Sequence, residues 1–265
     1  MPVTKFQTKV LTLLRQHRNP NSYVAGGVAI HRRPNSIRYS NDIDYFHDTD
    51  EAVTAGTKAD LLLLREASYQ VTILIDQPSF VRAVITKGEE SLKLEWARDT
   101  AFRFFPVIED DDLGYRLHDV DLAVNKCLAL ANRSEIRDII DLIQLNGEVL
   151  SLTAACWAAC GKDPGFTPEL LLDYMRRNSI IRSENLLAES LTQEYSPSQL
   201  KQIWLQLLDQ ATTELGLFPV EDLGCIYLNG DGAVVHYPDP KKLKDKHQHF
   251  GSIGGSWSRP VNSGA

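Results

Sequence analysis

The chain has 265 residues and a formal net charge of −7, with a sequence pI near 5.5. Its 43% hydrophobic and 24% charged residues are typical of a globular protein. No apolar run reaches the length of a membrane span, and the N-terminus lacks the apolar core of a signal peptide, so we expect a cytoplasmic location and no membrane partner. The acidic balance excludes binding of long nucleic acid over the whole surface, so any such contact must use a local basic patch.

The four cysteines do not indicate a disulfide framework. Cys127, Cys156, Cys160 and Cys225 are irregularly spaced, which argues against a set of disulfides. Cys156 and Cys160 share an alanine-rich helical stretch, where small core residues are expected and where a zinc site would need more ligands.

The N-terminal part of the chain alternates helical and strand patterns. Apolar spacing predicts a helix over residues 4–17, Gly26 opens a short helix that Pro34 ends, and Thr49 is the expected N-cap of a helix through Ala67 with a buried end at 61–64. Residues 37–46 have a strand pattern. Three more strands are predicted over Tyr69–Ile75, Phe80–Thr86 and Ser91–Trp96, the last two joined by a hairpin turn at 87–90.

From residue 118 the pattern becomes mostly helical. Helices are predicted over 119–131, 135–145, 150–160, 167–178, 183–192 and 197–214, followed by a small hairpin over 222–237. The sequence therefore predicts an α+β fold in three parts: a mixed core at 1–117, a mainly helical domain at 118–240, and a loosely ordered basic tail at 241–265. Phe250, Ile253 and Trp257 are the residues of this tail that are able to dock it.

The most informative segment combines a glycine pair with two carboxylates. Gly26 and Gly27 stand at the start of a helical run, where small residues let the backbone approach a ligand and a helix N-terminus favours an anion. Asp42 and Asp44 are two apart in a strand, so both side chains project from one face while Ile43 points into the core. Because two adjacent aspartates repel each other, a divalent cation is the expected partner.

A two-metal site needs a third carboxylate, and Glu95 is the predicted one. Its strand alternates Leu92, Leu94 and Trp96 on one face with Lys93, Glu95 and Ala97 on the other. By periodicity alone, Glu95 also fits a solvent-facing position. Asp99 is a nearby competitor, and the acidic loop 109–112 is expected to be solvated.

A second polar cluster interrupts the apolar helices after residue 119. Lys126 is able to contact a triphosphate as a point charge. Arg137, Asp138 and Asp141 are predicted to form a structural ion-pair network that holds these helices to the N-terminal half.

These motifs, taken in order, resemble one family. Gly26-Gly27, then Arg38-x-Ser40-x-Asp42-x-Asp44, then Lys126 with Arg137-Asp138 and Asp141, resemble the AbiEii/AbiGii-like nucleotidyltransferases over roughly residues 20–147. Those proteins are toxins of type IV-class toxin–antitoxin and abortive-infection systems, in the DNA polymerase β-like superfamily. The resemblance implies a nucleotidyltransferase core, built as a small mixed sheet with flanking helices, followed by a mostly helical C-terminal half.

The resemblance also implies a reaction and its participants. It implies Mg²⁺-dependent transfer of a nucleoside monophosphate from an NTP, most often to the 3′ end of tRNA, by a toxin or phage-defence component with a cognate antitoxin. Gly26, Gly27, Arg38 and Ser40 would then bind the nucleotide, Asp42 and Asp44 the metal, and Lys126 the triphosphate. Two alternatives stay open: an acceptor that is a protein or small molecule, and a non-catalytic module that binds a nucleotide or partner.

Overall fold

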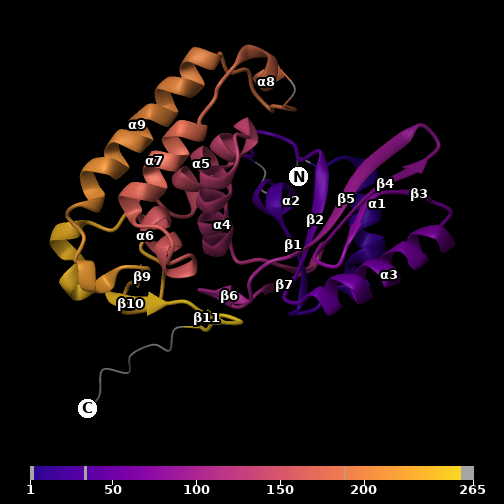
Figure 1. Cartoon of the computed structure of the whole chain (residues 1–265), viewed down its shortest axis with the longest axis horizontal. Helices are drawn as coiled ribbons and strands as arrows, with labels where there is room; N and C mark the ends of the chain where they lie inside the picture. The colour runs from indigo at the N-terminus through magenta and orange to yellow at the C-terminus, as the bar shows by residue number, and fades with distance from the viewer. Residues whose placement is uncertain (1–2, 33–34, 188, 258–265) are drawn as a thin grey trace. The chain divides into compact units, whose positions relative to one another are not determined.

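The computed structural model describes residues 3–32, 35–187 and 189–257 (Figure 1). They form two compact units. The first comprises the described parts of Met1–Ala101, Pro106–His118 and Ser190–Thr192, and the second those of Phe102–Phe105, Asp119–Glu189 and Gln193–Ala265. The predicted α+β class is confirmed, because a mixed sheet occupies the first unit and helices dominate the second.

The first unit is built on a seven-stranded mixed sheet with the order β3-β4-β5-β2-β1-β8-β7. Strand β2 pairs antiparallel with β1 and parallel with β5, while β3, β4 and β5 form an antiparallel meander. Strand β3 ends the sheet, and its register with β4 shifts between Ile73 and Ile75. The strands are β1 (Ser22–Ala25), β2 (Asp42–His47), β3 (Gln70–Gln77), β4 (Phe80–Lys87), β5 (Glu90–Arg98), β7 (Ile108–Asp110) and β8 (Gly114–Arg116).

The helices of the first unit begin where the sequence places their caps. Thr4 and Gln7 form a capping box at α1 (Lys5–Leu14), which continues into the 3₁₀ turn η1 (Arg15–His17). The short helix α2 (Gly26–Ile30) starts at the glycine pair. Thr49 accepts a hydrogen bond from the backbone N of Ala52 at the start of α3 (Asp50–Glu66), which packs against β2, β3, β4 and β5 (Figure 1). In the C-terminal part of α3, which was predicted to be buried at 61–64, Leu61 and Leu64 are buried whereas Leu62 is exposed.

The alternation predicted for the sheet is confirmed. On β5 the side chains of Leu92, Leu94 and Trp96 are buried, whereas Lys93 and Glu95 are partly exposed. On β2, Ile43 and Tyr45 are buried in the same way. One face of the central strands therefore belongs to the core, and the other remains accessible for polar groups.

A buried carboxylate on α3 joins the helical layer to this core face. Both oxygens of Asp60 accept from Nη2 of Arg18, at 2.7 and 2.5 Å, and Oδ2 accepts from the indole Nε1 of Trp96 at 2.8 Å. His17 Nδ1 lies 2.8 Å from Oδ1. The Arg18 guanidinium also lies 4.2 Å from the centre of the Tyr45 ring. One charged group thus fixes α3, the end of η1, β2 and β5 together.

The strand predicted over 37–46 starts later, at Asp42. Local side-chain hydrogen bonds explain the difference, because Ser36 Oγ donates to the backbone O of Arg38 and Ser40 Oγ donates to that of Asp42. The backbone before Asp42 pairs with 190–192 instead: Tyr39 N donates to Ser190 O, and Thr192 N to Ile37 O. These contacts hold residues 36–41 in an extended but irregular segment. Strand β1 was not predicted.

The second unit is a helical assembly around α4. Helix α4 packs against α5, α6 and α7, and α6 packs against α9 and β9. All four cysteines are buried and free, so the core role predicted for Cys156 and Cys160 is confirmed. The helices are α4 (Asp119–Asn132), α5 (Ile136–Glu148), α6 (Leu152–Lys162), α7 (Pro168–Asn178), α8 (Ser183–Leu187) and α9 (Pro197–Leu215).

Two predictions for the second unit are wrong in detail. Helix α8 is shorter than 183–192, because 190–192 pair with the segment before β2. The predicted hairpin forms in part: Leu228 and Val234 form a bridge across the turn at 229–232, and Val235 N donates to Tyr227 O. The full partner of β9 (Cys225–Leu228), however, is β10 (His247–Phe250). Between β9 and β10 lie the 3₁₀ turns of η3 (Pro240–Asp245); η2 (Val220–Asp222) precedes β9.

The C-terminal segment contains regular structure up to Ile253. Strand β11 (Ser252–Ile253) pairs with β6 (Phe102–Arg103), and the buried His249 ring stacks on Phe105 at a centroid distance of 4.8 Å. Phe250, Ile253 and Trp257 are all exposed, although the centre of the Trp257 ring lies 5.9 Å from that of Phe105. Residues 258–265 of the predicted tail lie outside the described residues.

Within the described ranges, no single helix combines the length and the apolar composition that crossing a membrane requires. The bent pair α5 and α6, which meet at 111°, passes that test only when both are counted together.

Replacing Asp60 with alanine will lower the free energy of unfolding by about 3–5 kcal/mol, because the buried Arg18 charge loses its partner. The matched control is Asp76→Ala, at an exposed acid on β3, for which the change stays within about 0.5 kcal/mol. Urea denaturation at constant pH measures both. Equal effects of the two substitutions would contradict the central role of Asp60.

The free energy of unfolding will also decrease in mild acid because of one histidine. Burial and the Arg18 charge lower the pKa of His47 from 6.5 to about 4. Because the folded state disfavours the protonated ring, the stability present above pH 6.5 is lost as the pH falls towards 4, by about 2 kcal/mol between pH 8 and pH 5. Urea midpoints of the wild type and of His47→Gln across this range measure it, since other titrations cancel in the difference.

Candidate functional site

The three predicted carboxylates lie on one face of the sheet, on neighbouring strands. In the parallel register of β2 and β5, Asp42 stands opposite Lys93 and Asp44 stands opposite Glu95. This face is opposite the one that buries Trp96. Because paired strands are about 4.8 Å apart, Asp44 and Glu95 are direct neighbours. We refer to Asp42, Asp44 and Glu95 together as the acid row.

Neither alternative acid has an equivalent position. Asp99 follows the end of β5, and its backbone N donates to His47 O beyond the acid row. In the loop 109–112, Asp110 accepts from Arg116 Nε at 3.1 Å and from the backbone N of Asp112 and Leu113, which closes the β7–β8 turn. Of the acids considered, Glu95 is therefore the one that pairs with Asp44.

The glycine pair packs directly against the acid row. Gly26 has a φ of +62°, and a Cβ added there would lie 1.8 Å from Asp44 Oδ2. A Cβ added to Gly27 would lie 2.5 Å from Ser40 Oγ and 3.0 Å from Arg38 Nη2. Any side chain at either position would collide with a candidate site residue. The two glycines and the acid row, separate in the sequence, are therefore one structural unit.

The segment before β2 supports the first carboxylate. The Ser40 hydroxyl donates to the backbone O of Asp42 at 3.0 Å and lies 3.2 Å from its Oδ1. Gln7 Nε2 donates to the backbone O of Ser40 at 2.6 Å. Arg38 is almost fully buried, and its Nη1 donates to the backbone O of Tyr39 at 3.0 Å. The segment is thus held on both sides, which fixes the direction of Asp42.

Two cations that the sequence analysis did not assign partly neutralise the acid row through Asp42 and Glu95. Lys93 Nζ lies 2.9 Å from Asp42 Oδ2 and 3.1 Å from Glu95 Oε1, and Arg82 Nε lies 2.9 Å from the same Glu95 oxygen. Burial disfavours the charged amine, but the hydrogen bonds and charges of Asp42 and Glu95 outweigh it and raise the pKa of Lys93. Strand alternation already placed Lys93 beside Glu95, but its pairing with Asp42 depends on the register of β2 and β5.

The donor chemistry of the acid row fits a hard divalent cation. Carboxylate oxygens are the ligands that Mg²⁺ prefers, and the Lys93 ammonium already occupies a cation position between two of them. Among the residues that the structure describes, no group of three His, Cys, Asp or Glu side chains is arranged so that it could hold a metal ion. A metal ion that used Asp42 Oδ2 and Glu95 Oε1 would displace the Lys93 ammonium from these oxygens.

The predicted helical cluster forms a buried ion-pair network in the second unit. Lys126 Nζ bridges Asp138 Oδ1 at 2.8 Å and Asp141 Oδ2 at 2.7 Å, and Arg133 donates to both oxygens of Asp138. Burial opposes ionisation of Asp138, but the charges and hydrogen bonds of Lys126 and Arg133 outweigh it and lower its pKa. Arg137 Nε lies 3.9 Å from a Glu135 oxygen. Lys126 thus joins α4 to α5, and its contact with a triphosphate stays a prediction.

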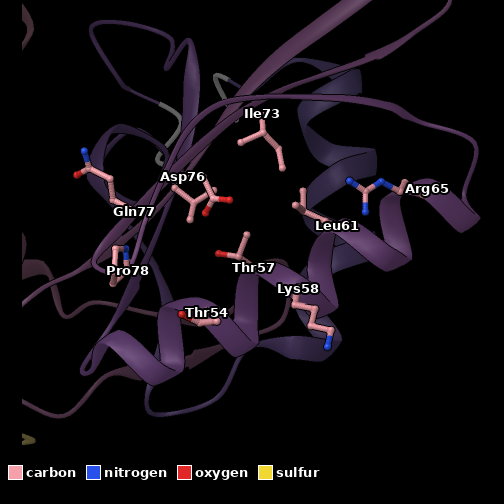
Figure 2. A pocket seen from close by; sticks show the side chains of 10 residues that line it. Thr54, Thr57, Lys58, Leu61, Arg65, Ile73, Asp76, Gln77 and Pro78 are labelled. Atoms are coloured by element: carbon pink, nitrogen blue, oxygen red, sulfur yellow. The ribbon is translucent and has the colours of Figure 1, made fainter.

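A cavity of about 510 Å³ lies between α3 and the β3–β4 hairpin, on the core side of the sheet (Figure 2). Figure 2 shows Thr57 and Leu61 of α3 facing Ile73 and Asp76 of β3. The buried Thr57 hydroxyl has no hydrogen-bond partner among the described residues. This cavity contains none of the predicted site residues.

The contact between Gly26 and Asp44 gives a direct prediction. Gly26→Ala will lower the free energy of unfolding by about 2 kcal/mol more than Gly88→Ala. Both glycines have φ above +60°, so both substitutions strain the backbone, but only Gly26 has a side chain within reach of its added Cβ. Urea denaturation compares them. Equal losses would show that Asp44 moves aside freely and that the two groups are not tightly packed.

Solved structures with a similar fold were found, whereas no protein-family profile and no curated protein matches the chain. JHP933 from Helicobacter pylori is 16% identical, with a TM-score of 0.51 over 80% of this chain and 91% of its own. A candidate nucleotidyltransferase from H. pylori is also 16% identical, with a TM-score of 0.51 over 80% and 94%. MenT4, a nucleotidyltransferase toxin from Mycobacterium tuberculosis H37Rv, is 15% identical, with a TM-score of 0.49 over 82% and 83%.

Identities this low show the fold alone. The chain has the fold of the two H. pylori structures, one of which bears the name of a nucleotidyltransferase, and at the level of the fold the family resemblance of the sequence is confirmed.

Proposed function

We propose that this protein is a Mg²⁺-dependent nucleotidyltransferase. The observation that carries the proposal is the packing of Gly26 and Gly27 against the acid row and its supporting residues, with Asp44 and Glu95 paired across β2 and β5. Glycines that bring a helix start close to carboxylates create space for a phosphate chain beside a metal ion. The shared fold and the ordered sequence motifs support the same reaction class.

The proposed reaction is an in-line displacement at phosphorus. An acceptor hydroxyl attacks the α-phosphorus of an NTP, a new oxygen–phosphorus bond forms, and the bond to the β-phosphate oxygen breaks. Pyrophosphate leaves with the bonding electron pair, and the hydroxyl proton passes to a carboxylate of the acid row or to solvent. Such chemistry needs positioning and charge neutralisation more than covalent help from the protein.

Each residue of the site has a role in this proposal. Asp42, Asp44 and Glu95 would hold one or two Mg²⁺ ions, which supply positive charge at the attacking and leaving oxygens. Gly26 and Gly27 would frame the phosphates, with Arg38 and Ser40 fixing the loop beside them. Lys126 would contact the triphosphate, as the family resemblance implies. Arg137, Asp138 and Asp141 would position Lys126 and the helices that carry it.

The acceptor is proposed from the sequence resemblance, and tRNA is the first candidate. Transfer to the 3′ end of tRNA would block aminoacylation, which fits a bacterial toxin or phage-defence component controlled by an antitoxin. The net charge of −7 leaves room for a local RNA contact but also suits a protein or small-molecule acceptor. The test of this chemistry therefore has to detect transfer to any of these acceptors.

Asp44→Asn is the decisive substitution. It keeps the shape of the side chain but removes a charged ligand, so transfer of α-labelled nucleotide will fall by at least about 100-fold. The measurement incubates the protein with Mg²⁺, each of four α-labelled NTPs and total bacterial tRNA. Asp76→Asn, which makes the same change at an exposed acid on β3, will keep wild-type transfer.

The pattern of labelling separates the alternatives. Label on tRNA with the wild type and with Asp76→Asn alone supports the full proposal. Label that appears only on a protein or small molecule of added lysate keeps the reaction and changes the acceptor. An NTP that binds without any transfer would identify a non-catalytic binding module, and undiminished transfer by Asp44→Asn would remove the metal assignment.

A further inference from the structure

Lys93 contacts two of the carboxylates that are proposed as metal ligands. Its ammonium lies between Asp42 Oδ2 and Glu95 Oε1, which belong to two different strands. These two carboxylates are proposed metal ligands, so the inference rests on the proposed function. We propose that Lys93 is an internal counter-cation of the acid row, which competes with the divalent ion for the same oxygens and moves to the nucleotide phosphates when that ion binds.

The competition follows from the use of particular oxygen atoms. Glu95 Oε1 already accepts from both Lys93 and Arg82, so a metal ion would have to replace at least one of these two contacts. Asp42 Oδ1 lies beside the Ser40 hydroxyl, which leaves Oδ2, the oxygen that Lys93 holds, as a natural metal ligand. A divalent ion and the ammonium cannot share these positions, because like charges at this spacing repel.

Lys93 is able to leave without disturbing the sheet. Its side chain is 32% exposed, compared with 7% for Asp42 and 16% for Glu95. The charge sits at the end of a flexible four-carbon stem, so the ammonium can swing while the backbone of β5 stays paired with β2 and β4. Arg82 remains next to Glu95 and keeps part of the charge balance.

The displaced ammonium would have a new partner in the substrate. Lys93 projects from the same sheet face as the acid row, so a triphosphate bound to the metal would lie within the reach of its stem. A compact ammonium is a good counter-ion for phosphate oxygens. The same residue would then weaken binding of the free metal ion and strengthen binding of the anion that follows it.

The test measures the metal and a phosphate chain separately. Mn²⁺ binding is followed by the loss of the free-ion electron paramagnetic resonance signal, and binding of inorganic triphosphate at saturating Mn²⁺ is followed by calorimetry. For Lys93→Gln we expect roughly tenfold tighter Mn²⁺ binding and roughly tenfold weaker triphosphate binding. Lys93→Arg, which keeps the charge, will lie close to the wild type in both.

The matched control is Lys58→Gln, an identical change at an exposed position of α3, and it will leave both constants unchanged. Circular dichroism verifies that each variant is folded. If Lys93→Gln folds only with metal, the charge-retaining Lys93→Arg is the variant that is compared with the wild type. The inference would be overturned if the dissociation constants of Lys93→Gln for Mn²⁺ and triphosphate equalled those of the wild type, or if both changed in the same direction. If Mn²⁺ binds neither the wild type nor Lys93→Gln, the metal site of the proposed function fails, which is a different result.

Discussion

The buried carboxylate of Asp60 determines which side of the central strands is available for chemistry. By accepting from Trp96 and Arg18, it holds the Trp96 indole on the core face of β5. Arg18 in turn covers the Tyr45 ring, so β2 is held on the same face. Because side chains alternate along a strand, anchoring Trp96 and Tyr45 inside forces Glu95 and Asp44 outside. A slip of one residue would exchange the two faces.

This arrangement also explains how the protein tolerates its acid row without a ligand. Three carboxylates on neighbouring strands would repel each other strongly, but Lys93 and Arg82 lie on the same surface and compensate them. The network of Lys126, Asp138 and Asp141 solves a similar problem differently, because its acids are fully buried and its charges are paired within two packed helices. One set of charges is accessible and exchangeable, and the other is permanent.

Most elements of this fold could be predicted from the sequence because their signals are local. Thr49 as an N-cap, the turn before Glu90 and the alternation of Leu92, Leu94 and Trp96 all depend on neighbours within a few residues. The face on which Glu95 lies followed from the same periodicity, whereas its position opposite Asp44 comes from the register of β2 and β5.

The parts that could not be predicted depend on contacts between distant segments. Residues 37–41 look strand-like, but Ser190 and Thr192 take their backbone hydrogen bonds. Strand β9 pairs in full with the distant β10 and only in part with the segment across its own turn. Lys93 is an ordinary lysine in the sequence, since its role depends on the register that brings Asp42 beside it. Similarly, nothing local reveals that the distant Asp60 and Arg18 would meet.

The shifted register of β3 has a consequence for self-association. This strand ends the sheet, and Ile73 and Leu74 are 42% and 55% exposed, so it offers an apolar edge to any other extended chain. Such edges promote strand addition between molecules. The irregularity between Ile73 and Ile75 interrupts the regular ladder at its most apolar point, so an incoming strand cannot stay in step along the whole edge. The register shift in β3 thus opposes the strand-to-strand pairing between molecules from which fibrous aggregates grow.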